Sequence, residues 1–285
     1  MFCNDESRKH EFHILIVRDN FIMENNITIT FVGTCSGTEP TPGRHHTSFT
    51  IENQGRLYWF DAGECCSYTA HVAGMDLPLT EAIFVSHTHM DHIGGLPNLL
   101  WTLNKLSNVS QDALHRLEDR VIEVFIPDLD VWDGILKLLA GTEGRFQTPF
   151  NLQAKRYEDG VIYDANGVRV IALHNGHLGH TAPFKSFSFR VEIGQRSIVY
   201  SGDVESIEDC EPLLDDCDML LMETGHHKVE DVCRWLKNSG KCIGQLIFVH
   251  HGRAVLDNHA RELGKANEIL GEEVSIAYDG MVVQL

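Results

Sequence analysis

Apolar residues recur along most of this chain in short extended runs that alternate with longer amphipathic stretches. Short runs rich in β-branched and aromatic residues predict strands, and stretches with helical spacing predict helices. Strands are expected near 27–32, 47–51, 56–60, 82–86, 121–126, 168–173, 187–193, 196–200, 218–222, 245–249 and 274–284. Helices are expected near 94–106, 129–140, 229–239 and 258–270, with Asp128 or Asp130 capping the second and Asn258 the last.

The first 22 residues do not share this pattern. Residues 1–9 are polar and irregular, and Met23 stands just before the first expected strand. An edge strand over 13–17, a disordered leader and a start assigned too far upstream are all open interpretations. Neither a repeat nor a linker marks a second domain, so we expect an N-terminal extension over 1–22 and one domain over 23–285.

Four metal-competent side chains lie within six positions, in the run His87-Thr88-His89-Met90-Asp91-His92. The run follows an apolar segment and precedes two glycines, which predicts a strand that ends in a loop and then a helix. His87 and His89 alternate and therefore share one face of an extended segment. Asp91 and His92 follow the turn and can aim at a second point nearby.

The spacing of these side chains suits two metal ions, roughly 3.5–4 Å apart as in other two-metal sites. One ion would take His87 and His89, and the other would take Asp91 and His92. Imidazole and carboxylate ligands suit zinc, with iron and manganese as alternatives. The structural alternative is a polar helix start, with Asp91 as a cap and the histidines in solvent.

The His-x-His-x-Asp-His run resembles that of the metallo-β-lactamase superfamily of metal-dependent hydrolases, and the resemblance extends from about Ile27 onward. It implies an α/β fold, the αββα four-layer sandwich. In Trp59-Phe60-Asp61-Ala62-Gly63, Asp61 resembles the aspartate that supports the metal site by orienting a ligand. By the same resemblance Asp203 bridges the two metals and His250, at the end of a predicted strand, is the last ligand.

The remaining ligand of the first metal falls in a stretch with three histidines. In the resembling family this ligand follows a strand, often with a glycine before it, and both His177 and His180 have one. His177 lies closer to the end of the apolar run 168–173 and is preferred over His180, with His174 third. Two positions distinguish this chain from other branches of the superfamily. Position 203 is aspartate rather than cysteine, which argues against the zinc β-lactamases, and position 89 is histidine rather than glutamate, which argues against the flavodiiron oxidoreductases.

A Gly-rich loop over 33–40 follows the first strand and leads through Arg44 into the next. It looks like the corresponding loop of the phosphodiesterase branch, which includes ribonuclease Z, although His45 stands where an asparagine usually follows the arginine. Backbone N–H groups of such a loop can contact phosphate oxygens. Arg44 is therefore a candidate substrate-binding residue, and a structural pairing with a carboxyl is the alternative.

A predicted buried strand delivers Glu223 and then His226 and His227 into a loop. Ribonuclease Z and the phosphonate-pathway phosphodiesterases carry a catalytic histidine at a comparable distance before the last ligand. Proton delivery to a leaving oxygen needs a group whose pKa lies near the working pH. We expect His226 to be this acid, with Asp91 as the other catalytic residue and His227 as a substrate-binding residue. A solvated histidine pair at a helix start is the alternative.

Net charge and the lengths of the segments between predicted ligands narrow the range of expected substrates. The net charge, 23 − 41 = −18, disfavours a grip on folded nucleic acid, which rests on Lys and Arg contacts to phosphates. Ribonuclease Z commonly inserts an arm for tRNA between the third ligand segment and the bridging aspartate, but only 25 residues lie between His177 and Asp203. A small anionic phosphodiester, such as a cyclic or short nucleotide, is the preferred substrate. The alternatives are ribonuclease Z-like RNA cleavage, ester, lactone or thioester hydrolysis, mononuclear iron dioxygenation as in persulfide dioxygenases, and a degenerate binding module.

Eight cysteines are scattered without the spacing of a metal finger, and no secretory leader is evident. Reduced thiols and a cytoplasmic location are the simpler interpretation. No apolar run approaches the length of a membrane span. A homodimer is compatible with the sequence, which does not fix the oligomeric state.

Overall fold

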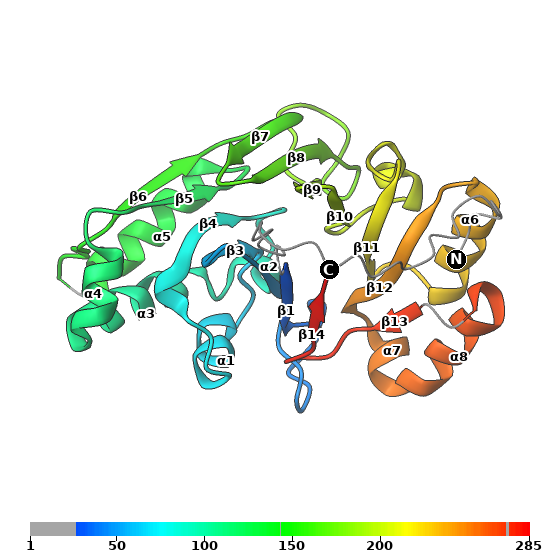
Figure 1. The fold of residues 1–285 in the computed structure, drawn as a ribbon, viewed down its shortest axis with the longest axis horizontal. Coiled ribbons are helices and arrows are strands. Elements are labelled where there is room, and N and C mark those ends of the chain that lie inside the picture. The colour runs from blue at the N-terminus through cyan, green and yellow to red at the C-terminus, as the bar shows by residue number, and fades with distance from the viewer. Residues whose placement is uncertain (1–26, 143, 272–273) are drawn as a thin grey trace, which may run out of the picture.

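The computed structural model describes residues 27–142, 144–271 and 274–285. The extension predicted over 1–22, with its candidate edge strand over 13–17, lies outside the described residues. The alternation of strands and helices predicted from the sequence is present from the first described residue to the last (Figure 1).

The described strands form two sheets of seven strands each. The first has the order β14-β1-β2-β3-β4-β5-β6, and its strands are β1 (Thr28–Gly33), β2 (Ser48–Asn53), β3 (Arg56–Phe60), β4 (Thr80–Phe84), β5 (Val121–Phe125), β6 (Asn151–Lys155) and β14 (Val282–Gln284). The second has the order β13-β12-β11-β10-β9-β8-β7, and its strands are β7 (Gly160–Ala165), β8 (Val168–His174), β9 (Phe187–Ile193), β10 (Arg196–Tyr200), β11 (Cys217–Thr224), β12 (Ile243–His251) and β13 (Val274–Ile276).

The two sheets pack face to face through aromatic side chains. Phe49, Phe60, Phe84 and Phe125 come from four neighbouring strands of the first sheet, and the centroids of successive rings are 4.9–5.0 Å apart. Phe189 of the second sheet meets Phe60 and Phe84 edge-on. All these rings are buried, and offset or edge-on aromatic pairs stabilise a core beyond the area they bury.

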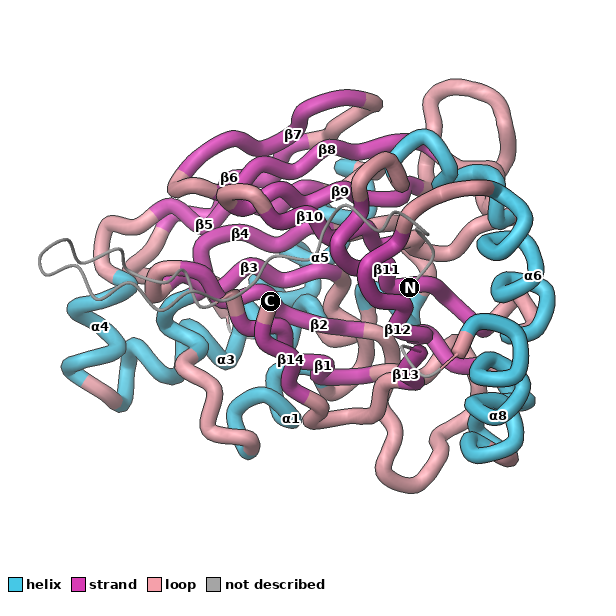
Figure 2. Tube along the Cα trace, turned by 45° about the vertical axis from the view of Figure 1, so that its right-hand side comes forward, coloured by secondary structure: helices cyan, strands magenta, loops and turns pink. Residues whose placement is uncertain are grey.

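Helices cover the outer face of each sheet, so the molecule has four layers (Figure 2). A second apolar cluster joins the first sheet to helices such as α3 and α5, and a third joins the second sheet to α6 and α8. The αββα fold class is confirmed. The helices are α1 (Cys66–Val72), α2 (Met90–Ile93), α3 (Leu96–Val109), α4 (Gln111–Leu117), α5 (Leu129–Thr142), α6 (Val229–Ser239), α7 (Arg253–Asp257) and α8 (His259–Leu270).

Most of the predicted elements are present, and the differences have simple causes. The stretch 274–284, predicted as one strand, is two strands in different sheets, because the chain turns at Gly280, whose φ is +87°. Strands β6 and β7 were not predicted; both lie at sheet edges, and of their residues only Tyr163 is buried, so neither carries the buried apolar run that marks a strand. Helix α8 is capped as predicted, by the Asn258 side chain, which accepts from the N–H of Arg261 at 3.0 Å.

Parallel pairing determines where the strand-end residues meet. β4 runs parallel to β3 and β5, and β11 runs parallel to β10 and β12. The carboxyl ends of parallel neighbours lie at one edge of a sheet, which is where sites form in such folds. The loops after β4, β8, β10 and β11, and the carboxyl end of β12, carry the histidines and carboxylates singled out above.

Candidate metal centre

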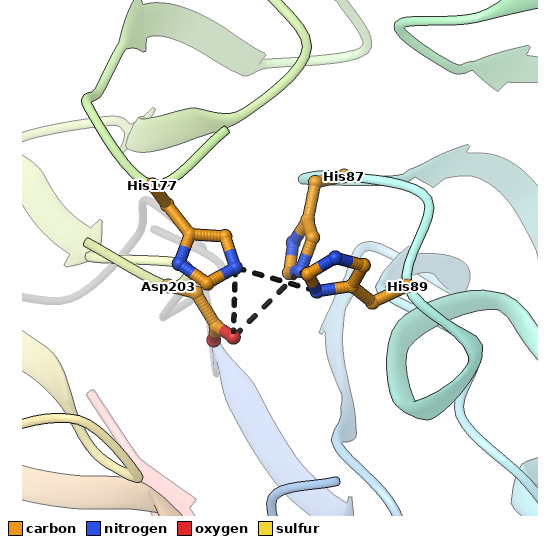
Figure 3. Close-up of side chains that lie close together, drawn as sticks. All are labelled: His87, His89, His177 and Asp203. Atoms are coloured by element: carbon orange, nitrogen blue, oxygen red, sulfur yellow. Dashed lines mark hydrogen bonds and ion pairs between the residues drawn. The ribbon is translucent and has the colours of Figure 1, made fainter. Parts of the chain in front are cut away.

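Four side chains from three separate loops converge on one point: His87, His89, His177 and Asp203 (Figure 3). The Nδ1 atom of His89 lies 3.1 Å from His87 Nε2 and 3.3 Å from His177 Nε2. Asp203 Oδ2 lies 3.7 Å from His87 Nε2 and 3.8 Å from His177 Nε2. Nitrogen and oxygen atoms at these separations surround a space that suits one metal ion, because each ligand would lie about 2 Å from it.

A second group shares Asp203 and adds Asp91, His92 and His250. His250 Nε2 lies 3.2 Å from His92 Nε2 and 3.1 Å from Asp91 Oδ2. The other oxygen of Asp203, Oδ1, lies 3.3 Å from His92 Nε2. One carboxylate therefore presents one oxygen to each group, which is the geometry that a bridge between two ions requires.

The local backbone is adapted to this convergence. Asp203 follows Gly202, whose φ is +58° and whose Cβ, if present, would lie 2.6 Å from the carbonyl oxygen of Phe187. His250 has a φ of +49° and Asp61 a φ of +57°, which are uncommon for residues with side chains. Such backbone strain concentrates at functional sites, where the surrounding structure holds it in place.

Asp61 lies behind the second group rather than in it. Its Oδ2 accepts from Nδ1 of His92 at 2.7 Å and from the hydroxyls of Ser86 and Tyr200 at 2.8 and 2.7 Å. With Nδ1 of His92 directed at Asp61, the other ring nitrogen, Nε2, faces the second group. A carboxylate in this place fixes the orientation and tautomer of a metal-ligating histidine.

The chemistry of these residues fits a pair of divalent ions. Burial, together with the neighbouring His92, holds the pKa of His87 well below its ordinary value, so its lone pair is free at neutral pH. Asp203 Oδ1 and His250 Nδ1 are buried without a well-formed hydrogen bond to any described residue. Buried polar atoms without a hydrogen bond are costly, and a bound cation would satisfy Asp203 Oδ1.

Glu223 and His226 form a further pair at the end of β11. Glu223 is fully buried; its Oε1 lies 3.0 Å from Nδ1 of His226, and its Oε2 accepts from the backbone N–H of His226 at 2.8 Å. The hydrogen bond to Glu223 raises the pKa of His226. The ring of His226 is half-exposed and lies 4.9 Å from that of His177, so this imidazole faces the space beside both groups.

Three predicted or alternative histidines lie outside the two groups. His180 is 72% exposed and pairs with Glu205 at 2.6 Å, so the structure brings His177 and not His180 to the first group. His227 bonds through Nε2 to the carbonyl oxygen of Val204 at 3.0 Å and does not line the cavity over the metal groups. His174 pairs with Asp159 at 2.6 Å.

Arg44 also lies apart from the two groups. Its Nη1 donates to Thr34 Oγ1 at 2.8 Å and to the carbonyl oxygen of Ala277 at 2.9 Å. It lines a neighbouring cavity of about 250 Å³ rather than the one that holds Asp203. This position favours the structural alternative for Arg44, although its partners are a hydroxyl and a carbonyl rather than a carboxyl.

Two residues of the site were not predicted from the sequence. Glu223 was noted as delivered by a buried strand but received no role, and Arg253 was not considered. Arg253 lines the cavity over the metal groups, and it is the first residue of α7, three positions after His250. A basic residue so soon after a predicted ligand is the one feature of the sequence that points to it.

Comparison with known proteins identifies the family. The model of the family described as "Anti-Pycsar protein Apyc1" matches residues 27–266 of this chain. The chain belongs to the anti-Pycsar protein Apyc1 family. The resemblance to the metallo-β-lactamase superfamily, and to its ribonuclease Z-like branch, is confirmed for this family member by the curated relatives and solved structures it matches.

The relatives of this family member include several ribonucleases Z. That of Treponema pallidum (strain Nichols) is 44% identical over 78 residues, 27% of this chain, and the match spans only 25% of that protein. That of Picrophilus torridus is 26% identical over 71% of this chain and 74% of the relative. The chain thus spans about a quarter of the length of the first of these relatives.

Solved structures show the fold. The metallo-β-lactamase fold protein YhfI from Bacillus subtilis superposes with a TM-score of 0.72 at 18% identity, over 92% of this chain and all of YhfI. The short form of human tRNase Z superposes with a TM-score of 0.67 at 19% identity, over 90% of this chain and 98% of the other. Unliganded yeast PDE1 superposes with a TM-score of 0.57 at 16% identity, over 92% of this chain and 100% of the other. Within the described part of the chain, no helix has the length and apolarity needed to cross a membrane.

Proposed function

We propose that this chain is a dinuclear metal-dependent hydrolase that cleaves a small phosphodiester, such as a cyclic or short nucleotide. The observation that carries this proposal is the position of Asp203, which offers one carboxylate oxygen to each group of histidines. The names of its relatives support the same class: ribonuclease Z, yeast PDE1 and a diphosphatase of the PhnP family.

Seven residues would hold the ions. His87, His89 and His177 would bind the first, Asp91, His92 and His250 the second, and Asp203 would lie between them. When bound, two zinc ions would neutralise the substrate phosphate and supply a nucleophilic oxygen from water at neutral pH. Iron and manganese remain the alternatives, because both also accept imidazole and carboxylate ligands.

The remaining residues provide orientation and a proton. Asp61 holds His92 with its Nε2 toward the second group of residues, where it would bind an ion. Glu223 holds His226 by both its backbone N–H and its Nδ1, so the opposite nitrogen, Nε2, is free to donate. The hydrogen bond to Glu223 raises the pKa of His226, which favours the protonated, proton-donating form. It would protonate the alkoxide that leaves when the phosphodiester is cleaved, which is the role of a general acid.

The substrate is expected to be small. Between His177 and Asp203 the chain forms the hairpin β9–β10 and no extended arm, and the net charge of −18 disfavours a folded nucleic acid. A panel of chromogenic phosphodiesters, lactones and thioesters, tested on zinc-loaded protein, separates the hydrolase classes. Elemental analysis alongside it should give two ions per chain. Cleavage of lactones or thioesters but of no phosphodiester would refute the proposal, and a single iron ion per chain would favour the dioxygenase alternative.

A further inference from the structure

The cavity above the metal groups has a volume of about 400 Å³ and is lined mostly by acidic, imidazole and small side chains. Among the described residues that line it, Arg253 carries the one permanent positive charge. The lining residues are Ser36, Gly37, Thr38, His89, Asp91, Asp203, Gly225, His226, His250, Gly252 and Arg253. A phosphodiester anion entering this cavity therefore meets one guanidinium beside the two carboxylates of Asp91 and Asp203.

The backbone of Arg253 is held close to the metal ligands. Gly252 precedes it, and a Cβ at Gly252 would lie 2.9 Å from the carbonyl oxygen of Thr224 and 3.1 Å from that of Gly225. This close packing anchors the start of α7 on the end of β11, three positions after His250. Asp203, at the bottom of the cavity, is 2% exposed, whereas the Arg253 side chain is 64% exposed and lies at its mouth.

Glu39 holds the guanidinium of Arg253 at this mouth. A carboxylate oxygen of Glu39, on the loop between β1 and β2, contacts Nη2 of Arg253. The Glu39 side chain is 59% exposed, so both partners are open to water. Exposed ion pairs contribute little to stability, and the pair can part at small cost. A guanidinium binds carboxylate and phosphate oxygens with the same geometry, so Glu39 contacts the Arg253 guanidinium that a phosphate would otherwise bind.

We propose that Arg253 is a substrate-binding residue that exchanges Glu39 for the phosphodiester anion as the substrate enters the cavity. Glu39 is then an internal competitor whose carboxylate weakens substrate binding. This inference rests on the proposed function for its substrate class. It adds that Arg253 draws the anion from solvent toward the metal groups and that Glu39 competes with the anion for Arg253.

Four proteins test the exchange: wild type, Arg253→Gln, Glu39→Gln and the double variant. Two quantities are measured: KM for bis(p-nitrophenyl) phosphate on zinc-loaded protein, and the Kd of inorganic phosphate for the metal-free protein by calorimetry. Arg253→Gln should raise both by roughly tenfold, as for the loss of a charge-assisted hydrogen bond. Glu39→Gln should lower both by roughly threefold, within the range of an exposed ion pair. The double variant should behave like Arg253→Gln, because without Arg253 there is nothing for Glu39 to block.

Matched controls separate this effect from a general change of charge. Arg234→Gln removes a guanidinium that is 61% exposed on α6, and Glu64→Gln removes a carboxylate that is 64% exposed beside the same loop as Glu39. Neither should change KM or Kd by more than about twofold. Unchanged KM and Kd in Arg253→Gln would overturn the proposal. Weaker substrate or phosphate binding in Glu39→Gln would also overturn it, because the Glu39–Arg253 ion pair would then stabilise the binding site instead of competing with the anion.

The two proposals fail in different ways. If the wild type cleaves no phosphodiester, the proposed function fails, and phosphate binding still decides the role of Arg253. If the wild type cleaves the diester and all four proteins share one KM and one Kd, the proposed function stands and the exchange between Glu39 and Arg253 is wrong.

Discussion

Oδ2 of Asp61 lies 2.7 Å from Nδ1 of His92, and both side chains are fully buried. The contact fixes which nitrogen of His92 faces the other residues of the second group, although Asp61 itself belongs to neither group. We therefore expect Asp61→Asn to weaken the binding of metal by roughly 10–100-fold, the usual cost of losing such a partner. Asparagine tolerates the left-handed backbone at this position, so the fold should persist. Competition with a zinc chelator measures the affinity, and an unchanged affinity would contradict the orienting role.

Asp203→Ala tests the bridging carboxylate. Because Asp203 faces both groups, its loss should empty at least one metal site and reduce phosphodiester cleavage by more than the roughly 100-fold associated with outer partners. Circular dichroism should show a folded protein. Elemental analysis that still finds two ions, together with turnover near the wild-type rate, would rule out a bridge.

His177→Ala and His180→Ala form a matched pair that tests the third histidine. His177 lies within the first group, whereas His180 is exposed and pairs with Glu205. The His177 variant should lose metal from the first site, and the His180 variant should keep wild-type metal content and activity. The reverse result would show that the segment rearranges when metal binds.

His226→Ala tests proton donation. General acids contribute roughly 10²–10⁴-fold to rate, so the variant should lose this much on diesters with alkoxide leaving groups. The loss should be small for nitrophenolate, which departs without a proton, and metal content should not change. Equal losses on both leaving groups would exclude the role. His227→Ala is the control, because its ring bonds to the carbonyl of Val204, and it should show no dependence on the leaving group.

The pH dependence follows from Glu223. Its hydrogen bond raises the pKa of His226, so the acid form persists to higher pH than in an ordinary histidine and is lost as the pH rises through that pKa. Activity on poor leaving groups should therefore fall on the alkaline side. Glu223→Gln removes the charge that favours the imidazolium, so the alkaline limb should move to lower pH. A pH–rate profile of the variant that overlays that of the wild type would show that Glu223 does not set this pKa.

The sequence by itself determined the fold class and most of the candidate metal-binding residues that the structure brings together. His87, His89, Asp91 and His92 are readable because they fall within six positions, where strand and turn geometry alone fix their relative directions. Strands with buried apolar runs, such as β4 and β12, were equally readable. Strands β6 and β7 were not, because edge strands do not need an apolar pattern.

Tertiary structure decided the contacts between distant segments. His177 and His180 have nearly the same local sequence, and only the path of the loop after β8 brings one to the metal groups and leaves the other in solvent. Arg44 was a candidate because of its Gly-rich loop, yet folding directs it toward Thr34 and Ala277. Glu39 and Arg253 are 214 positions apart and meet only because β1 and β12 deliver their loops to the same edge of the sandwich. Sequence periodicity fixes which face of an element is buried, but contacts across such distances depend on how the two sheets pack.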